Sequence, residues 1–167
     1  KKHWEHFDLG NLFHKALELF HMVYIKDGTS KKTLGKIMGE SFATARKEFP
    51  NMKDELAADA KNMLMDYLAS VQKNGMPVVK GCETPFEFEL EDKVIVRGFV
   101  DRIDVLKDGK FRIIDYKTTK SVKYLNEFQL SVYGVWLKKQ YPHIDEFNGA
   151  YVLLKHKSTL KEYTFNN

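Results

Sequence analysis

The stretch 97–117 constrains the fold of this chain most, because it predicts a β-hairpin that carries charged side chains among apolar ones. Asp108-Gly109, between the two apolar runs, is a strong signal for a tight hairpin turn. Side chains alternate between the two faces along a strand. We therefore expect Asp115 and Lys117 to share one face of the second strand, at the end remote from the turn.

Charged side chains on an apolar strand face need compensation, since buried charges are paired or bound to metal. One interpretation is a lysine–aspartate ion pair at the end of the sheet. The other is a metal site formed by Asp101 and Asp115, with Lys117 as a catalytic lysine beside it. Asp104 is an odd number of residues from Asp101, so we expect it on the opposite face of the first strand and outside such a site.

The segments around the hairpin predict helices followed by strands. Apolar residues at helical spacing predict helices across about 8–72, with Asp8 as the N-cap of the first helix. Phe86 and Phe88 then alternate with glutamates, which predicts a half-buried strand. After the hairpin we expect one helix and two further strands, a central one and an edge one, at about 125–140, 150–154 and 160–165.

Length and composition limit the classes of protein that fit. A chain of 167 residues is expected to form a single domain over 1–167, with a helical part at about 8–72 and a sheet with a crossover helix at about 83–165. Its net charge of +4 permits binding to a phosphate backbone without demonstrating it. With no apolar run of membrane length and no signal-peptide pattern, we expect no membrane partner and a cytoplasmic location. The single cysteine, Cys82, agrees with this and excludes a four-cysteine iron–sulfur cluster within this chain.

The hairpin motifs resemble those of a known family. Gly98-Phe99-Val100-Asp101, followed by Asp115-Tyr116-Lys117-Thr118, resembles the signature of PD-(D/E)XK nucleases and more narrowly the RecB-type branch found in RecB, AddA and AddB. Gly10-Asn11-Leu12-Phe13-His14 is similar to the segment of that branch in which a histidine on the first helix reaches the metal. Gln129 and Tyr133 resemble its Q-x-x-x-Y motif. The resemblance extends from Gly10 to about Tyr163 and implies an α/β fold of the restriction-endonuclease-like kind, a mixed β-sheet core flanked by helices.

The resemblance also implies a function. It points to a DNA nuclease that hydrolyses phosphodiester bonds with a divalent metal, most simply a sequence-nonspecific exonuclease of recombination or repair that works beside a helicase domain or partner subunit. Mg²⁺ would be held by Asp101, Asp115, the backbone carbonyl of Tyr116 and the ring of His14. Because imidazole is a softer ligand than Mg²⁺ prefers, Mn²⁺ is an alternative metal. Lys117 would orient or deprotonate the attacking water, and Gln129 with Tyr133 would hold the strand or the lysine in place.

Other interpretations stay open beside this one. A DNA-binding module of the same fold without catalysis is the main alternative, although such modules lack one or more of the acids or the lysine. An enzyme that uses Asp101 and Asp115 as an acid–base pair would need neither Lys117 nor the glutamine–tyrosine helix. Glu83 matches a position that is often acidic in RecB-type domains, but it is equally compatible with a surface glutamate at a strand end. His3, His6 and His21 match no motif and are expected at the surface.

Overall fold

The computed structural model describes residues 2–166, apart from the side chains of residues 2–4 and 6. The contacts within the chain group into two compact units. A helical unit comprises Lys1–Met76, Lys117–Lys120 and Leu153–Thr159, and a sheet unit comprises Pro77–Tyr116, Ser121–Val152 and Leu160–Asn167. That the whole chain folds as one domain remains a prediction.

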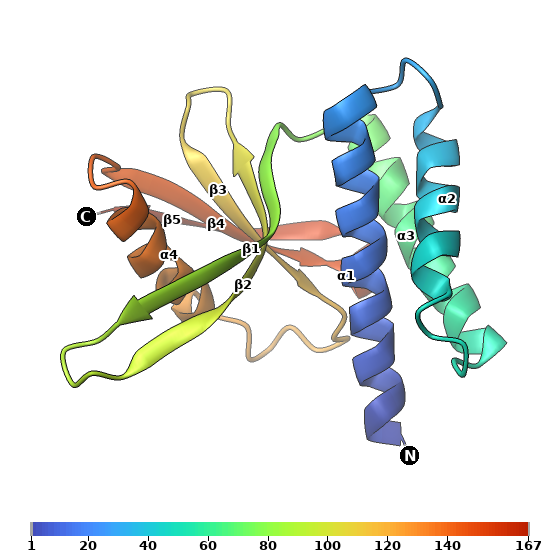
Figure 1. Cartoon of the computed structure of the whole chain (residues 1–167), viewed down its shortest axis with the longest axis horizontal. Coiled ribbons are helices and arrows are strands. Elements are labelled where there is room, and N and C mark those ends of the chain that lie inside the picture. The colour runs from blue at the N-terminus through green and yellow to red at the C-terminus, as the bar shows by residue number, and fades with distance from the viewer. Residues whose placement is uncertain (1, 167) are drawn as a thin grey trace. The chain divides into compact units, whose positions relative to one another are not determined.

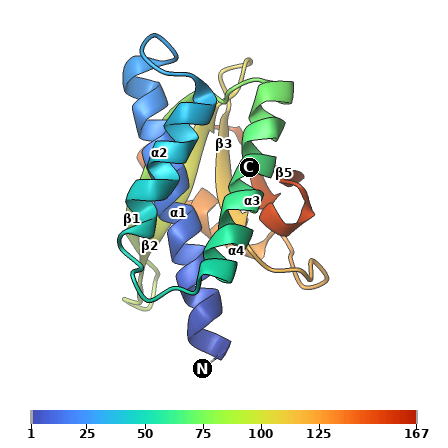
Figure 2. The same cartoon turned by 90° about the vertical axis from the view of Figure 1, so that its right-hand side faces the viewer.

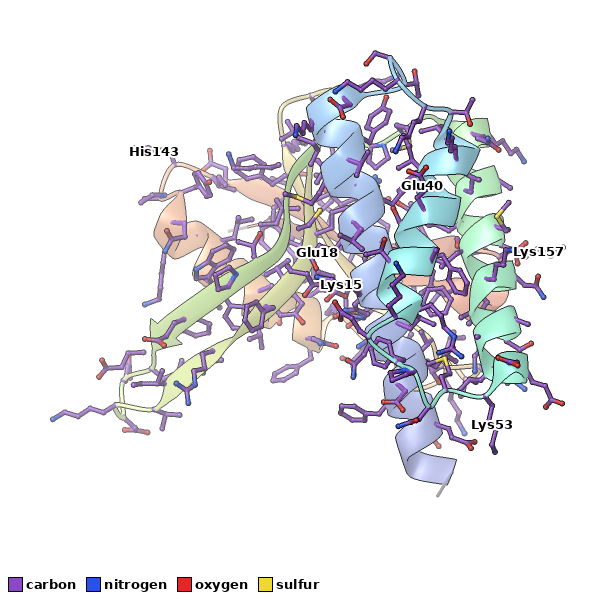
Figure 3. The ribbon with its side chains drawn as sticks, turned by 45° about the vertical axis from the view of Figure 1, so that its right-hand side comes forward. Lys15, Glu18, Glu40, Lys53, His143 and Lys157 are labelled. Carbon is purple, nitrogen blue, oxygen red and sulfur yellow. The ribbon has the colours of Figure 1, made fainter. Side chains whose placement is uncertain are left out.

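Three helices build the helical unit: α1 (Lys2–Asp27), α2 (Leu34–Arg46) and α3 (Asp54–Asn74). Each helix contacts the other two, and α2 and α3 lie side by side in both views (Figures 1 and 2). Their shared core consists of large aliphatic and aromatic side chains at helical spacing, among them Leu12, Phe13, Phe20, Ile37, Met38 and Leu64. On α1 the Lys15 ammonium lies 3.9 Å from the Glu18 carboxylate (Figure 3).

The ends of these helices follow local rules, with one exception. The side chain of Thr33 caps α2 by accepting a hydrogen bond from the backbone N–H of Lys36. Gly28, with φ of 57°, follows α1 in the left-handed conformation that favours glycine. The prediction of Asp8 as the first N-cap was wrong, because α1 begins at Lys2. No proline or glycine interrupts the chain before Gly10, so nothing stops the helix from extending towards the N-terminus.

His21 does not lie at the surface, and that expectation was wrong. Its ring is buried in the helical unit, and its Nε2 lies 2.6 Å from the hydroxyl of Tyr67 on α3. His21 follows Leu17 by four residues, so it falls on the buried side of α1. Its partner comes from 46 residues further along the chain, which a local pattern does not reveal. The side chains of His3 and His6 lie outside the described residues.

The sheet unit is built on one five-stranded sheet in the order β1-β2-β3-β4-β5. The strands are β1 (Val79–Glu89), β2 (Ile95–Val105), β3 (Phe111–Lys117), β4 (Glu146–Leu153) and β5 (Thr159–Asn166), and α4 (Phe128–Gln140) connects β3 to β4. β1 is antiparallel to β2, and β2 is antiparallel to β3. The short 3-10 helix η1 (Leu154–His156) separates β4 from β5 and contacts α3 within the helical unit.

This architecture confirms the predicted α/β fold with a mixed sheet and helices. β4 is a central strand and β5 an edge strand, as their hydrophobic patterns predicted. The predicted turn is present as well, since Gly109 has a φ of 84° and the backbone N–H of Lys110 donates to Asp108 Oδ1 at 3.0 Å. β1 starts several residues before Phe86, because its early part is held by pairing with β2 and not by a hydrophobic alternation of its own.

Candidate active site

The two predicted carboxylates lie where β2 and β3 meet. Arg102 pairs with Ile114, so the same register continued by one residue sets Asp101 opposite Asp115. Both aspartates are buried, and Asp101 Oδ2 accepts a hydrogen bond from the backbone N–H of Tyr116 at 2.7 Å. The strand register therefore brings the first acidic motif against the second.

Asp104 lies on the opposite face of β2, as the alternation of side chains predicted. It pairs with Arg112 across the sheet, and Arg102 binds its carboxylate in a bidentate way, with Nε–Oδ1 and Nη2–Oδ2 distances of 2.7 and 3.0 Å. Arg112 Nη2 adds a contact of 3.3 Å to the same Oδ2. Asp104 is thus a fully buried acid whose charge is compensated by two arginines, which excludes it from the candidate metal site.

Arg102 also contacts β3, the strand that carries Asp115 and Lys117. Arg102 Nη1 donates to the Tyr116 hydroxyl at 2.9 Å, and its guanidinium lies 5.6 Å from the centre of the Tyr116 ring. Tyr116 is also the residue whose backbone N–H holds Asp101. The ion pair on one face of the sheet therefore fixes the strand segment that carries the carboxylates on the other.

Glu83 on β1 joins these acids. Cys82 pairs with Arg102 and Thr84 with Val100, which sets Glu83 opposite Asp101, and carboxylate oxygens of the two acids lie within 4.8 Å of each other. Glu83 has a φ of 45°, a left-handed conformation inside a strand. For a residue with a side chain this costs on the order of 1–3 kcal/mol, and such strain is concentrated at functional sites. The sequence left the place of Glu83 open, and only the pairing of β1 with β2 reveals it.

The glutamine and tyrosine of α4 form a chain of hydrogen bonds that ends on Asp115. Gln129 Nε2 donates to the Tyr133 hydroxyl at 2.8 Å, and that hydroxyl donates to Asp115 Oδ1 at 3.2 Å. Burial raises the pKa of Tyr133 above its ordinary value, and the negative charge of Asp115 raises it further. The phenol therefore stays protonated and remains a donor to the carboxylate.

Two predicted site residues belong to other parts of the chain. Lys117 is the last residue of β3, two residues after Asp115, and alternation sets both on one face of the strand. His14 lies on α1, in the helical unit, and its part in the site remains a prediction from the sequence.

The donor set of the sheet unit fits a hard divalent cation. Glu83, Asp101 and Asp115 offer carboxylate oxygens, which Mg²⁺ and Mn²⁺ prefer over nitrogen or sulfur. The carboxylates of Glu83 and Asp101 are close enough to share one cation, which would remove the repulsion between their charges.

Comparison with known proteins agrees with this geometry. The model of the PD-(D/E)XK nuclease superfamily matches residues 2–166. The chain belongs to this superfamily. The predicted resemblance is therefore confirmed, and the five-stranded sheet with flanking helices is the fold of this PD-(D/E)XK chain.

Known relatives of the chain indicate the RecB-type branch of this superfamily. Over 110 residues, the chain is 32% identical to an ATP-dependent helicase/deoxyribonuclease subunit of Streptococcus mutans serotype c, covering 65% of this chain and 8% of that protein. It is 26% identical over 171 residues to the proteins of the same name from Streptococcus pyogenes serotypes M1 and M49, covering 93% of this chain and 16% of each. These helicase/nuclease subunits support the RecB-type assignment, and the chain spans less than a fifth of their length. Across the part of the chain that the structure describes, no helix has the length and apolar character needed to cross a membrane.

Proposed function

We propose that this PD-(D/E)XK chain is a metal-dependent deoxyribonuclease that hydrolyses phosphodiester bonds. The observation that carries the proposal is the strand register, which sets Asp101 opposite Glu83 on β1 and opposite Asp115 on β3, in a superfamily of nucleases. Lys117 follows on the same strand, so the carboxylates and the lysine of the motif are all present.

Asp101, Asp115 and Glu83 would hold a divalent ion, together with the Tyr116 carbonyl and, as the sequence predicts, His14. When bound, such an ion lowers the pKa of water and neutralises charge on the phosphoryl oxygens. Lys117 would orient the attacking water as an ammonium, or take up its proton as a neutral amine. Tyr133 holds Asp115 by its hydrogen bond, and the Tyr116 backbone N–H holds Asp101. These two contacts keep the carboxylates in place before substrate arrives.

We further propose that the enzyme is a sequence-nonspecific exonuclease of recombination or repair. The Streptococcus relatives are named as subunits of an ATP-dependent helicase/deoxyribonuclease, which supports both DNA as the substrate and a helicase domain or subunit as the partner. Mg²⁺ is the expected metal and Mn²⁺ the alternative. The competing function is a DNA-binding module without catalysis, and the retention of both aspartates and the lysine argues against it.

A cleavage assay on linear and circular DNA tests this proposal. The purified chain should shorten end-labelled linear DNA in Mg²⁺ or Mn²⁺, stop when the metal is chelated, and leave closed circles intact. Asp115→Asn should abolish cleavage, whereas Asp108→Asn, the same change at the exposed hairpin turn, should not. If the chain opens closed circles, its activity is that of an endonuclease and not of an exonuclease. DNA binding without cleavage in either metal would favour the inactive module.

A further inference from the structure

The segment 121–128, which leads from β3 to α4 in the sheet unit, has an anchored backbone. The hydroxyl of Tyr151 on β4 donates to the Asn126 carbonyl at 2.7 Å, and the ammonium of Lys161 on β5 donates to the Leu125 carbonyl at 2.9 Å. Within the segment, Asn126 Oδ1 accepts from the backbone N–H of Phe128 at 3.0 Å. Two neighbouring strands thus hold a connection that has no regular secondary structure over most of its length.

This anchored segment nevertheless presents two aromatic rings to solvent. Tyr124 is 81% exposed and Phe128 is 73% exposed. Several other aromatic rings of the sheet unit pack against one another, as Phe147 and Phe165 do with their centroids 4.8 Å apart, although Phe99 on β2 is exposed as well. Exposed rings forgo the stabilisation that burial of apolar area gives. Rings exposed on a held backbone are therefore more typical of a binding surface than of an unstructured loop.

A positive charge accompanies the rings. The Lys123 ammonium lies 5.6 Å from the centre of the Tyr124 ring, within the range of a cation–π contact. Aromatic faces beside lysines are the combination that binds single-stranded nucleic acid, because unpaired bases stack on the rings while lysines contact phosphates. In a duplex the faces of the bases are already stacked on their neighbours, so such rings gain little from it.

The segment is also connected directly to the candidate active site. Phe128 is the residue before Gln129, the first member of the hydrogen-bond chain through Tyr133 to Asp115. A base stacked on Phe128 would therefore lie at the N-terminal end of α4, the helix whose Tyr133 holds the carboxylate of Asp115.

We propose that Tyr124 and Phe128 form a stacking surface for the unpaired bases of single-stranded DNA, with Lys123 as its phosphate contact. The proposal rests on the nuclease function proposed above and adds the residues that contact the bases of the strand. The enzyme then binds a single strand by its bases as well as its backbone, and it binds a duplex by its backbone alone.

Fluorescence of 2-aminopurine tests the stacking directly, because this base analogue is quenched when it stacks. The full chain is mixed, in chelator to prevent cleavage, with a short single-stranded DNA that carries one 2-aminopurine. The wild-type protein should quench the fluorescence. Tyr124→Ala and Phe128→Ala should each reduce the quenching and weaken single-strand affinity about 5- to 150-fold, since one base stacked on an aromatic ring contributes about 1–3 kcal/mol. Affinity for a duplex of equal length should fall much less.

Conservative variants separate stacking from simple apolar contact. Tyr124→Phe and Phe128→Tyr keep a ring and should retain quenching, whereas Tyr124→Leu and Phe128→Leu keep an apolar side chain and should lose it. Lys123→Ala should reduce the slope of log affinity against log salt by about 0.7, the value for one phosphate contact on a single strand. Both rings are exposed, so these changes leave the packed core intact.

Two results would overturn the stacking surface: alanine variants that quench and bind as the wild type does, or leucine variants that do so. The second result would show that these side chains make simple apolar contact with the strand and do not stack on its bases. Failure of the nuclease function is detected separately, with bis(p-nitrophenyl) phosphate as a small phosphodiester that has no base to stack. A wild-type chain that hydrolyses neither this ester nor DNA in Mg²⁺ or Mn²⁺ is no nuclease, whatever the quenching shows.

Discussion

Removing the Arg102 guanidinium should destabilise the chain severely, because it leaves a buried charge with inadequate compensation. Arg102 is 3% exposed and its partner Asp104 is 1% exposed. The change Arg102→Met keeps an apolar stem of similar length but removes the bidentate pair to Asp104 and the hydrogen bond to the Tyr116 hydroxyl. Asp104 would then keep only the longer contact of 3.3 Å from Arg112.

The size of the effect follows from this burial. Breaking a buried ion pair by removing one partner costs about 3–5 kcal/mol, because the other charge stays out of water. Single domains have unfolding free energies of only about 5–15 kcal/mol, so the variant should lose a large share of its stability. The double change Arg102→Met with Asp104→Leu should recover much of the loss, since replacing both charges by apolar groups removes the uncompensated carboxylate.

Urea denaturation of the full chain, followed by circular dichroism, measures these free energies. The matched control is Lys110→Met, which breaks a half-exposed pair between the hairpin and β4, where the Lys110 ammonium lies 3.1 Å from Glu146. This change should alter stability far less, because exposed ion pairs are screened by solvent. If Arg102→Met lowers the free energy of unfolding by less than about 1 kcal/mol, or by no more than Lys110→Met does, this prediction is refuted. The buried Arg102–Asp104 pair would then not stabilise β3.

Three further predictions concern the candidate site and its surroundings. Tyr133→Phe removes the donor to Asp115 and should lower the cleavage rate or the apparent metal affinity about 10- to 100-fold, with an unchanged circular dichroism spectrum. An unaltered rate together with an unaltered metal titration would exclude a supporting role for the hydroxyl. Burial, followed by the charge of Asp115, raises the pKa of Tyr151 to about 12, so its contribution to stability is complete below the ordinary value near 10 and is lost as pH rises through about 12. Stability measured against pH should therefore fall over that window in the wild type and fall less steeply in Tyr151→Phe. DNA affinity, measured by anisotropy, should weaken steeply with salt and differ little between sequences, and cleavage confined to one short sequence would contradict the predicted phosphate contacts.

The local chemistry of the hairpin was predictable because it depends on short-range rules. The turn residues fix the register of β2 and β3, and the register together with alternation assigns Asp101 and Asp104 to opposite faces. The four-residue spacing of Gln129 and Tyr133 likewise made them neighbours on one helix.

What the sequence did not reveal depends on pairing between distant segments. Glu83 meets Asp101 only because β1 and β2 pair with one particular register, and its left-handed backbone has no signature in its neighbours. The burial of Asp104 required two arginines to reach it, and an aspartate in a strand is more often expected to face solvent. His21 is buried by a tyrosine on another helix. In each case the deciding partner is remote in sequence.

The turnover of Lys117→Ala on end-labelled linear DNA in saturating Mg²⁺ tests the central claim most directly. The proposed task of Lys117 is to act on the attacking water, so the variant should lose cleavage while its folding and its DNA affinity in chelator stay close to those of the wild type. Lys110→Ala, on the same hairpin but at the turn, serves as the matched control and should cleave normally. Turnover of Lys117→Ala near the wild-type rate would show that the lysine is only an ion-pair partner and would contradict the mechanism.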